Sequence, residues 1–293
     1  MPASLLMVAA SFLFATMGVC VKLAAARYGS AEIVFYRGLT GTLILGALTR
    51  WRRGSLRTHV PAMHFWRSLS GVTALCLWFY AIGHLPLATA MTLNYMSSIW
   101  MAMFLLGAAL LIGAQRVDKR LVFTVLIGFV GVSLMLRPTI EQNQLWSGLI
   151  GILSGVMSAT AYLQVAALAK AGEPEYRIVF YFSLGGAIAG ALTTSLAGWH
   201  GHTWDGIGLL LAVGVLATAA QLLMTRAYTI GRPLVNASLQ YLGIAFSFGY
   251  GVLLFNDRLT WTAVAGMVLI VAAGVWAAQI RTTAAEPTKA SSA

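Results

Sequence analysis

Long apolar runs, separated by short polar or basic segments, occupy almost the whole chain. A helix that crosses a bilayer needs about 20 mostly apolar residues, and ten runs reach or approach that length. The alternation of period two that marks a membrane β-barrel is absent from the sequence. The pattern therefore predicts an all-α integral membrane protein with ten transmembrane helices. Their expected positions are 3–23, 31–49, 63–83, 87–112, 120–137, 145–169, 176–197, 206–229, 234–255 and 261–280.

The composition also favours a membrane protein. Charged residues make up 9% of the chain and hydrophobic residues 59%, whereas about a quarter of the residues in a soluble domain are charged. The net charge of +11 would suggest nucleic-acid binding in a soluble protein. Here the basic residues lie in short loops and not on one presented face, which argues against a nucleic-acid partner. We expect a small-molecule substrate and membrane lipid as partners, with no obligatory protein partner.

The basic loops predict the orientation of the chain. With the N-terminus in the cytoplasm and the spans alternating, most of the 19 Lys and Arg residues face the cytoplasm. The densest basic segment, residues 50–67, then lies inside, as the positive-inside rule requires. We therefore expect a multi-pass protein of the cell inner membrane with both termini cytoplasmic. Residues 282–293 are small and polar and predict a disordered cytoplasmic tail.

Short sequence matches in a shared order relate the two halves of the chain. They are YAIG at 80–83 with YTIG at 228–231, Pro86-Leu87 with Pro233-Leu234, and LNYM at 93–96 with LQYL at 239–242. The matches pair the third and fourth spans with the eighth and ninth, so each half has five spans. Because five is odd, the halves would enter the membrane from opposite sides, an arrangement typical of transporters. The predicted units are 1–138 and 139–281; chance similarity is the alternative explanation.

Several motifs carry a resemblance to a known family. They are FYR at 35–37, WFYAI at 78–82, GFVGV at 128–132 followed by LRP at 136–138, and NDRL at 256–259. With these motifs the chain resembles the EamA-type ten-helix members of the drug/metabolite transporter superfamily over nearly its whole length. The resemblance implies inverted five-helix repeats, export of small metabolites and no cofactor. General similarity, mainly in the second to fifth spans, is to the amino-acid exporters, including an aromatic amino-acid branch.

Two segments depart from the family pattern. Glu-Arg-Leu often follows the fourth and ninth spans in the family, whereas this chain has Gln115-Arg116-Val117 and Asp257-Arg258-Leu259. An acidic role at the first of these positions is therefore not carried over.

Polar and aromatic side chains inside the spans mark a predicted substrate cavity, because such groups are costly at membrane depth unless they face the bundle or water. Asn94 and Gln240, equivalent in the repeat, would hydrogen-bond the amino and carboxylate groups of a zwitterion. Aromatic side chains would pack against apolar parts of the substrate. The alternative is that these groups hydrogen-bond neighbouring helices, at about 0.6 kcal/mol each. The predicted substrate-binding residues are Trp78, Tyr80, Asn94, Tyr95, Ser97, Trp100, Tyr162, Gln221, Gln240 and Tyr241.

Other residues have more local interpretations. Lys22 and Arg37 lie toward the outer ends of their spans and are expected to extend to lipid headgroups, or else to pair with Glu32 or meet a substrate carboxylate. Few other cations fall inside spans, which argues mildly against phosphorylated substrates. Gly186 and Gly190 are spaced for close helix packing.

The acidic residues bear on energy coupling and on rival functions. All eight Asp and Glu residues lie at span ends or in loops, whereas proton-coupled carriers commonly use a titratable group within the membrane. We therefore expect facilitated, alternating-access transport without tight proton coupling. A membrane-embedded enzyme would be suggested by His200, His202 and Asp205, which suit zinc, but no nucleophile–base pattern accompanies them. A channel would lack an evident selectivity filter. The sequence thus predicts a transporter and no enzyme, with other metabolites or drugs as alternative substrates.

Overall fold

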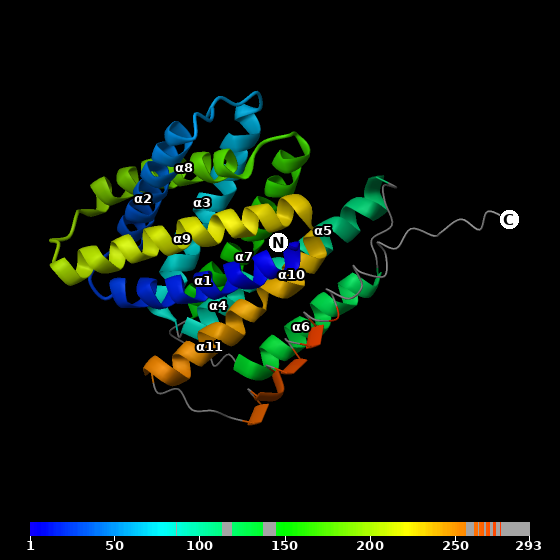
Figure 1. The fold of residues 1–293 in the computed structure, drawn as a ribbon. Helices are drawn as coiled ribbons and strands as arrows, with labels where there is room; N and C mark the ends of the chain where they lie inside the picture. Colours follow the sequence, from blue (N-terminus) through cyan, green and yellow to red (C-terminus); the bar gives the residue numbers. More distant parts are fainter. Residues whose placement is uncertain are drawn as a thin grey trace.

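The computed structural model describes residues 1–85, 87–112, 119–136 and 145–255, with further short pieces at 261–262, 264–266, 268–269, 272–273 and 276. Within these ranges the regular structure is entirely α-helical, which confirms the predicted fold class. The last predicted span (261–280) lies largely outside the described residues, as does the predicted tail. The helices are α1 (Ala3–Ala24), α2 (Ser30–Trp51), α3 (Pro61–His84), α4 (Leu87–Tyr95), α5 (Ser97–Ile112), α6 (Lys119–Leu136), α7 (Leu145–Lys170), α8 (Glu175–Ala197), α9 (Trp204–Ile230), α10 (Pro233–Gln240) and α11 (Leu242–Phe255) (Figure 1).

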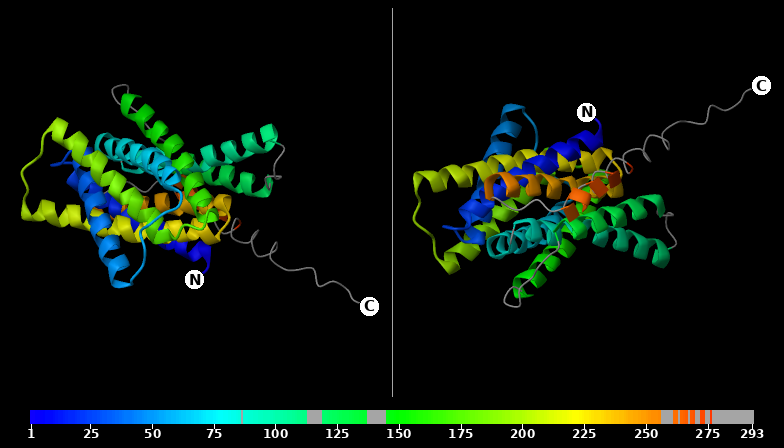
Figure 2. Two further views of the ribbon diagram at one scale, coloured as in Figure 1. Left: turned by 90° about the horizontal axis from the view of Figure 1, so that it is seen from above. Right: turned by 90° about the horizontal axis from the view of Figure 1, so that it is seen from below.

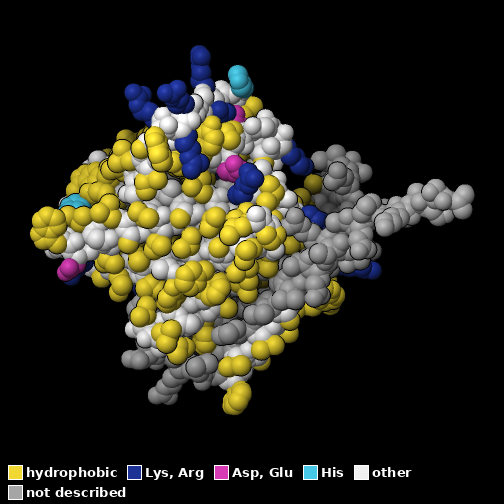
Figure 3. All heavy atoms as spheres, in the orientation of Figure 1, with side chains coloured by type: hydrophobic (Ala, Val, Ile, Leu, Met, Phe, Trp, Pro, Cys, Tyr) yellow, Lys and Arg dark blue, Asp and Glu magenta, His cyan; other side chains and the backbone are white. Residues whose placement is uncertain are grey.

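The surface of the molecule is that of a membrane protein. Six stretches of the described helices are long and apolar enough to cross a bilayer. Figure 3 shows hydrophobic side chains over the middle of the visible face and Lys and Arg side chains gathered at its top edge. The α2–α3 loop lies at that edge and contributes the exposed Arg52, Arg53 and Arg57. The chain is therefore a multi-pass membrane protein with a basic segment at one end.

Helix ends are fixed by local chemistry. Pro61 begins α3 at a position where its missing N–H has no intrahelical partner. Thr203 caps α9 by accepting a hydrogen bond from the backbone N–H of Gly206. Lys22 donates through Nζ to the carbonyls of Ile82 and Leu85 at 2.8 Å each, at the C-terminal end of α3. The predictions that Lys22 reaches headgroups or pairs with Glu32 are thus wrong, because α3 ends beside it with free carbonyls.

Three helix pairs make the most extensive contacts: α2 with α8, α1 with α9, and α3 with α7. Figures 1 and 2 show these helices packed side by side in one bundle. The α2–α8 pair meets through small residues on both sides. A Cβ atom at Gly38 would collide with the backbone of α8, and one at Gly190 would lie 2.6 Å from the backbone nitrogen of Phe35. The predicted packing role of the span glycines is confirmed here.

Two predicted spans are each broken into two helices. The span at 87–112 is interrupted at Met96, between α4 and α5, and the span at 234–255 is interrupted at Tyr241, between α10 and α11. At the second break the backbone N–H of Tyr241 bonds Ser238 instead of Ala237. The carbonyl of Ala237 accepts from Ser98 Oγ at 2.8 Å, so the freed group is satisfied within the protein, as the membrane interior requires.

Candidate functional site

A cavity lies between seven helices, α1 to α4 and α7 to α9. Half of the predicted substrate-binding residues line it, namely Trp78, Asn94, Tyr95, Tyr162 and Gln221. The remaining lining residues are Phe14, Arg37, Arg67, Gly71, Ala74, Leu75, Ser158, Ala161 and Phe182.

One face of α3 supplies the largest share of the lining. Arg67, Gly71, Ala74 and Trp78 follow the i, i+4, i+7, i+11 spacing of a single helix face. Arg67 is 2% exposed, and a side chain at Gly71 would overlap its guanidinium. The sequence prediction placed Arg67 with the basic cytoplasmic loop, which is wrong. Arg67 lies on the same helix face as Trp78, so helical spacing counted back from Trp78 could have revealed it.

Arg37 reaches the same cavity from α2. It is 4% exposed, and its Nη2 donates to Gln221 Oε1 at 3.3 Å. Its Cζ lies 5.0 Å from the centroid of the Phe182 ring, and the Cζ of Arg67 lies 4.2 Å from the same centroid. Arg37 therefore neither reaches the headgroups nor pairs with Glu32, because the small residues of the α2–α8 contact draw α2 into the bundle.

The two arginines lack compensating negative charge among the described residues. None of the ion pairs formed by the described carboxylates involves either of them. Arg37 Nε, Arg67 Nε and Arg67 Nη1 are buried without a hydrogen-bond partner in the described part of the chain. A cation–π contact is worth about 0.5–2 kcal/mol, whereas burying an ion costs several kcal/mol. Arg67 is thus a buried cation that the sequence analysis did not count among the in-span cations, and the cavity is suited to an anionic group.

The cavity lining from α4 and α7 is neutral and includes polar groups. Asn94 donates through Nδ2 to Ser154 Oγ and Ser158 Oγ at 3.1 Å each. Tyr162 stacks on Tyr228, with ring centroids 5.5 Å apart and planes 17° apart. Both of the Asn94 contacts use its amide nitrogen.

The other predicted site residues do not line this cavity. Gln240 is buried behind it, where its Oε1 accepts from the Tyr228 hydroxyl at 3.4 Å. Tyr80 stacks on His84 near the end of α3, with ring centroids 4.0 Å apart. Ser97 and Tyr241 are fully buried beside the two helix breaks, and Trp100 is partly buried on α5. The structure thus brings five of the ten predicted residues together around the cavity, and the other five are not part of its lining.

Comparison with known proteins identifies the family. The EamA-like transporter family matches residues 1–137. Over 273 residues the chain is 34% identical to the pseudopaline exporter CntI of Pseudomonas aeruginosa, covering 92% of this chain and 93% of that protein. The chain belongs to the EamA-like transporter family. It is a membrane transporter of small metabolites.

More distant similarities extend over the same length. A riboflavin transporter of Brucella anthropi is 23% identical over 277 residues, covering 92% of this EamA-like chain and 96% of the relative. A solved crystal structure superposes with a TM-score of 0.78 at 18% identity, covering 95% of this chain and 98% of the other. That likeness shows a shared fold.

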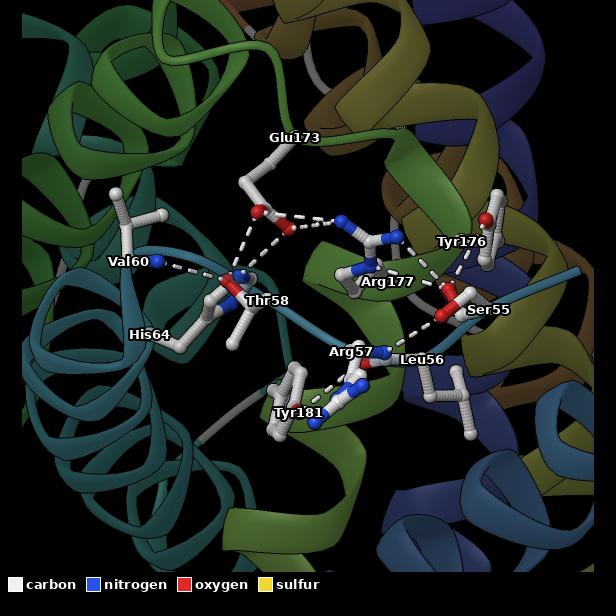
Figure 4. Close-up of polar contacts among 10 residues, drawn as sticks. All are labelled: Ser55, Leu56, Arg57, Thr58, Val60, His64, Glu173, Tyr176, Arg177 and Tyr181. Carbon is white, nitrogen blue, oxygen red and sulfur yellow. Dashed lines mark hydrogen bonds and ion pairs between the residues drawn. The ribbon is translucent and has the colours of Figure 1, made fainter.

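A charged cluster connects two loops of this EamA-like transporter at the end of the molecule that carries the basic α2–α3 loop (Figure 4). We call it the Glu173 cluster: Thr58 and His64 from the α2–α3 region with Glu173 and Arg177 from the α7–α8 region. Glu173 accepts from Thr58 Oγ1 at 2.8 Å, His64 Nε2 at 3.0 Å and Arg177 Nη1 at 3.1 Å. Burial raises the pKa of the Glu173 carboxyl, but the hydrogen bonds from Thr58, His64 and Arg177 outweigh it and hold the pKa below its ordinary value of 4.5. No sequence signal pointed to this cluster, because its partners are far apart in the chain.

A second cluster lies where the α1–α2 and α8–α9 loops meet. We call it the Glu32 cluster: Arg27, Glu32, His200, His202 and Thr203. His200 Nδ1 lies 2.8 Å from Glu32 Oε2, His202 Nε2 lies 3.8 Å from Glu32 Oε1, and Arg27 donates to Thr203 at 2.8 Å. In the described part of the chain no group of three or more His, Cys, Asp and Glu residues could hold a metal ion. The two histidines thus face Glu32, which tethers one loop to the other.

Proposed function

We propose that this EamA-like transporter exports amino acids and related small metabolites, aromatic and other neutral ones included, across the cell inner membrane. The observation that carries the proposal is the cavity with two buried guanidiniums that no described carboxylate neutralises. In the proposed complex, Arg37 and Arg67 hold the substrate carboxylate and the Asn94 carbonyl oxygen accepts from its ammonium. Trp78 and Tyr162 pack against its apolar part. Similarity to a protein named as an exporter supports the direction.

Alternating access is supported by the helix contacts. If residues 1–138 and 139–281 are inverted repeats, α1, α2 and α3 correspond to α7, α8 and α9. Exchanging the two halves turns the α1–α9 contact into the α7–α3 contact and leaves the α2–α8 contact unchanged. These are the three most extensive helix contacts among the described residues. The two helix breaks also fall within one residue of each other in the proposed repeat alignment, and broken helices commonly surround transporter substrate sites.

The two charged clusters are suited to act as gates. Each connects a loop of one proposed half to a loop of the other, and they lie at opposite ends of α2 and α8. Outward and inward opening would break one cluster at a time. We further propose cytoplasmic termini, which put the Glu173 cluster on the cytoplasmic side.

The proposed transport is facilitated, without tight proton coupling. The cavity lining contains no carboxylate among the described residues. Asp118, Glu141, Asp257 and Glu286 lie outside those residues. Proton-coupled carriers commonly bind the proton on an acidic group within the membrane.

Counterflow into liposomes tests the proposal. Liposomes containing the purified full-length protein would be loaded with unlabelled amino acids. A panel of labelled aromatic, aliphatic and acidic amino acids would then be added outside. We expect saturable exchange, weakened at least about 10-fold by Asn94→Ala and unchanged by Arg52→Gln, a change at an exposed loop position. Exchange by no member of the panel, from protein that is folded, would contradict the proposal. Accumulation driven solely by an imposed pH gradient would contradict facilitated transport.

A further inference from the structure

We infer that Arg37 and Arg67 form a double-arginine subsite that selects substrates carrying at least two carboxylates. The inference rests on the proposed function, because it assumes that the cavity is the transport site. It narrows the substrate class from amino acids in general to acidic amino acids and other small polycarboxylates.

The burial of both guanidiniums carries the first step. Arg37 is 4% exposed and Arg67 is 2% exposed, so bulk solvent does not screen their charges. The partners they have in the described residues are neutral: the Phe182 ring for both, and Gln221 for Arg37. Neutral partners reduce the cost of burial without cancelling the charge.

The number of charges carries the second step. A neutral amino acid brings one carboxylate together with an ammonium group, so its net charge is zero and two positive charges stay uncompensated. A substrate with two carboxylates can give one to each guanidinium. Both guanidinium carbons lie within 5.0 Å of the same ring centroid, so a single small molecule can reach both. Guanidinium groups favour carboxylates because their planar donors match two oxygens at once.

The local packing is built around the Arg67 guanidinium. Gly71 leaves the space that the guanidinium occupies, since a Cβ atom there would overlap Nη1 and lie 2.9 Å from the Phe182 ring. The Nε and Nη1 atoms of Arg67 have no hydrogen-bond partner in the described part of the chain. A surface arginine turned inward by chance would not need a glycine one helical turn away to accommodate it.

Binding to the purified full-length protein tests the inference independently of transport. The probes are succinate, its monoamide succinamate, and inorganic phosphate. A ligand that binds only the folded state stabilises it by RT ln(1 + [L]/Kd), so the melting temperature rises with the ligand concentration relative to Kd. We expect succinamate to need at least about a 10-fold higher concentration than succinate for the same rise in melting temperature, a ratio of about 1.4 kcal/mol. Phosphate should be weaker than succinate.

Variants distinguish the subsite from a general charge effect. Arg67→Gln and Arg37→Gln should each reduce the succinate preference to about 2-fold or less, whereas the exposed Arg52→Gln should retain it. Gly71→Ala keeps both charges but crowds Arg67, and should weaken succinate binding in protein that still melts cooperatively.

Equal binding of succinate and succinamate, retention of the preference in both glutamine variants, or tighter binding of phosphate would each overturn the inference. Counterflow of neutral amino acids without any succinate preference would support the proposed function and overturn the double-arginine subsite. A succinate preference without counterflow would support the subsite and overturn the proposed function.

Discussion

The central cavity and the Glu173 cluster both bury charged side chains, but only the Glu173 cluster supplies them with charged and hydrogen-bonding partners. In the Glu173 cluster one carboxylate accepts hydrogen bonds from Thr58, His64 and Arg177, all within 3.2 Å. In the cavity two guanidiniums share one aromatic ring, and Arg37 has one amide contact besides. Burial alone therefore does not distinguish the two regions; the supply of partners does.

The difference separates a structural role from a binding role. A buried charge whose partners are all in the protein stabilises one arrangement of the helices that carry it. A buried charge without partners destabilises the empty protein and is retained where a ligand supplies the missing group, a familiar conflict between stability and function. The Glu173 cluster is accordingly the expected gate, and the cavity is the expected substrate site.

Of the changes that test this difference between the two regions, Arg67→Gln should have the largest effect, and the effect should be on transport. The change removes the charged donors proposed for the substrate carboxylate, and hydrogen bonds to charged groups are worth about 1.5–3 kcal/mol. We expect the initial rate of counterflow at low substrate to fall about 100-fold. The melting temperature of the substrate-free protein should be unchanged or higher, because an uncompensated buried charge is removed. Retained transport, or a large loss of stability without substrate, would contradict the assignment.

Glu173→Gln should have the opposite pattern. The change removes the negative charge and one of the two acceptor oxygens that serve His64 and Arg177, and breaking a buried pair costs about 3–5 kcal/mol. Because Arg177 is 13% exposed, we expect a smaller loss of about 2–3 kcal/mol in the free energy of unfolding. Denaturant titration of the purified protein would measure it, with Glu175→Gln, at a more exposed ion pair, as the matched control. An unchanged free energy of unfolding would contradict the proposed role of the Glu173 cluster as a gate.

The pH dependence of stability sharpens the same comparison. Since the pKa of Glu173 is lower in the folded protein than its ordinary value of 4.5, the carboxylate contributes stability at pH values above 4.5. This contribution is lost as the pH falls through the lower, folded-state pKa. The difference in stability between wild type and Glu173→Gln should therefore be constant from about pH 5 to pH 6 and shrink below about pH 4.5. A difference that grows on acidification would contradict the sign of the shift.

The smallest effect is expected at the Glu32 cluster. The His200 side chain is 55% exposed, and exposed pairs contribute about 0–1 kcal/mol. We expect His200→Ala to cost less than about 1 kcal/mol of unfolding free energy, below the cost of His64→Ala, whose side chain is 3% exposed. Equal costs for the two histidine variants in the same denaturant titration would remove the distinction between the gates.

Much of the fold could be predicted because the bilayer imposes a strong pattern. Apolar runs of bilayer length predicted the helices up to residue 255 to within a few residues, and the spacing of Gly186 and Gly190 predicted close helix packing. The breaks at Met96 and Tyr241 were not predicted. Neither position has glycine or proline, and the freed Ala237 carbonyl is satisfied by Ser98 from a distant segment.

The candidate site was predicted in part, for a related reason. Trp78 and Asn94 were identified because polar and aromatic groups inside an apolar span stand out. Arg67 was missed because a basic residue near the start of a span also fits the loop before it. The Glu173 cluster depends on contacts between residues far apart in the chain, which spacing along one helix does not report.

The most direct test of the central claim is a competition between glutamate and glutamine in counterflow, measured on wild type and Arg67→Gln in parallel. The two amino acids have nearly the same size and differ by one carboxylate. Glutamate should compete at least about 10-fold better than glutamine in wild type, and the difference should disappear in the variant. Equal competition in wild type, or a preference that survives the loss of Arg67, would contradict the claim that the unpaired arginines form the substrate site.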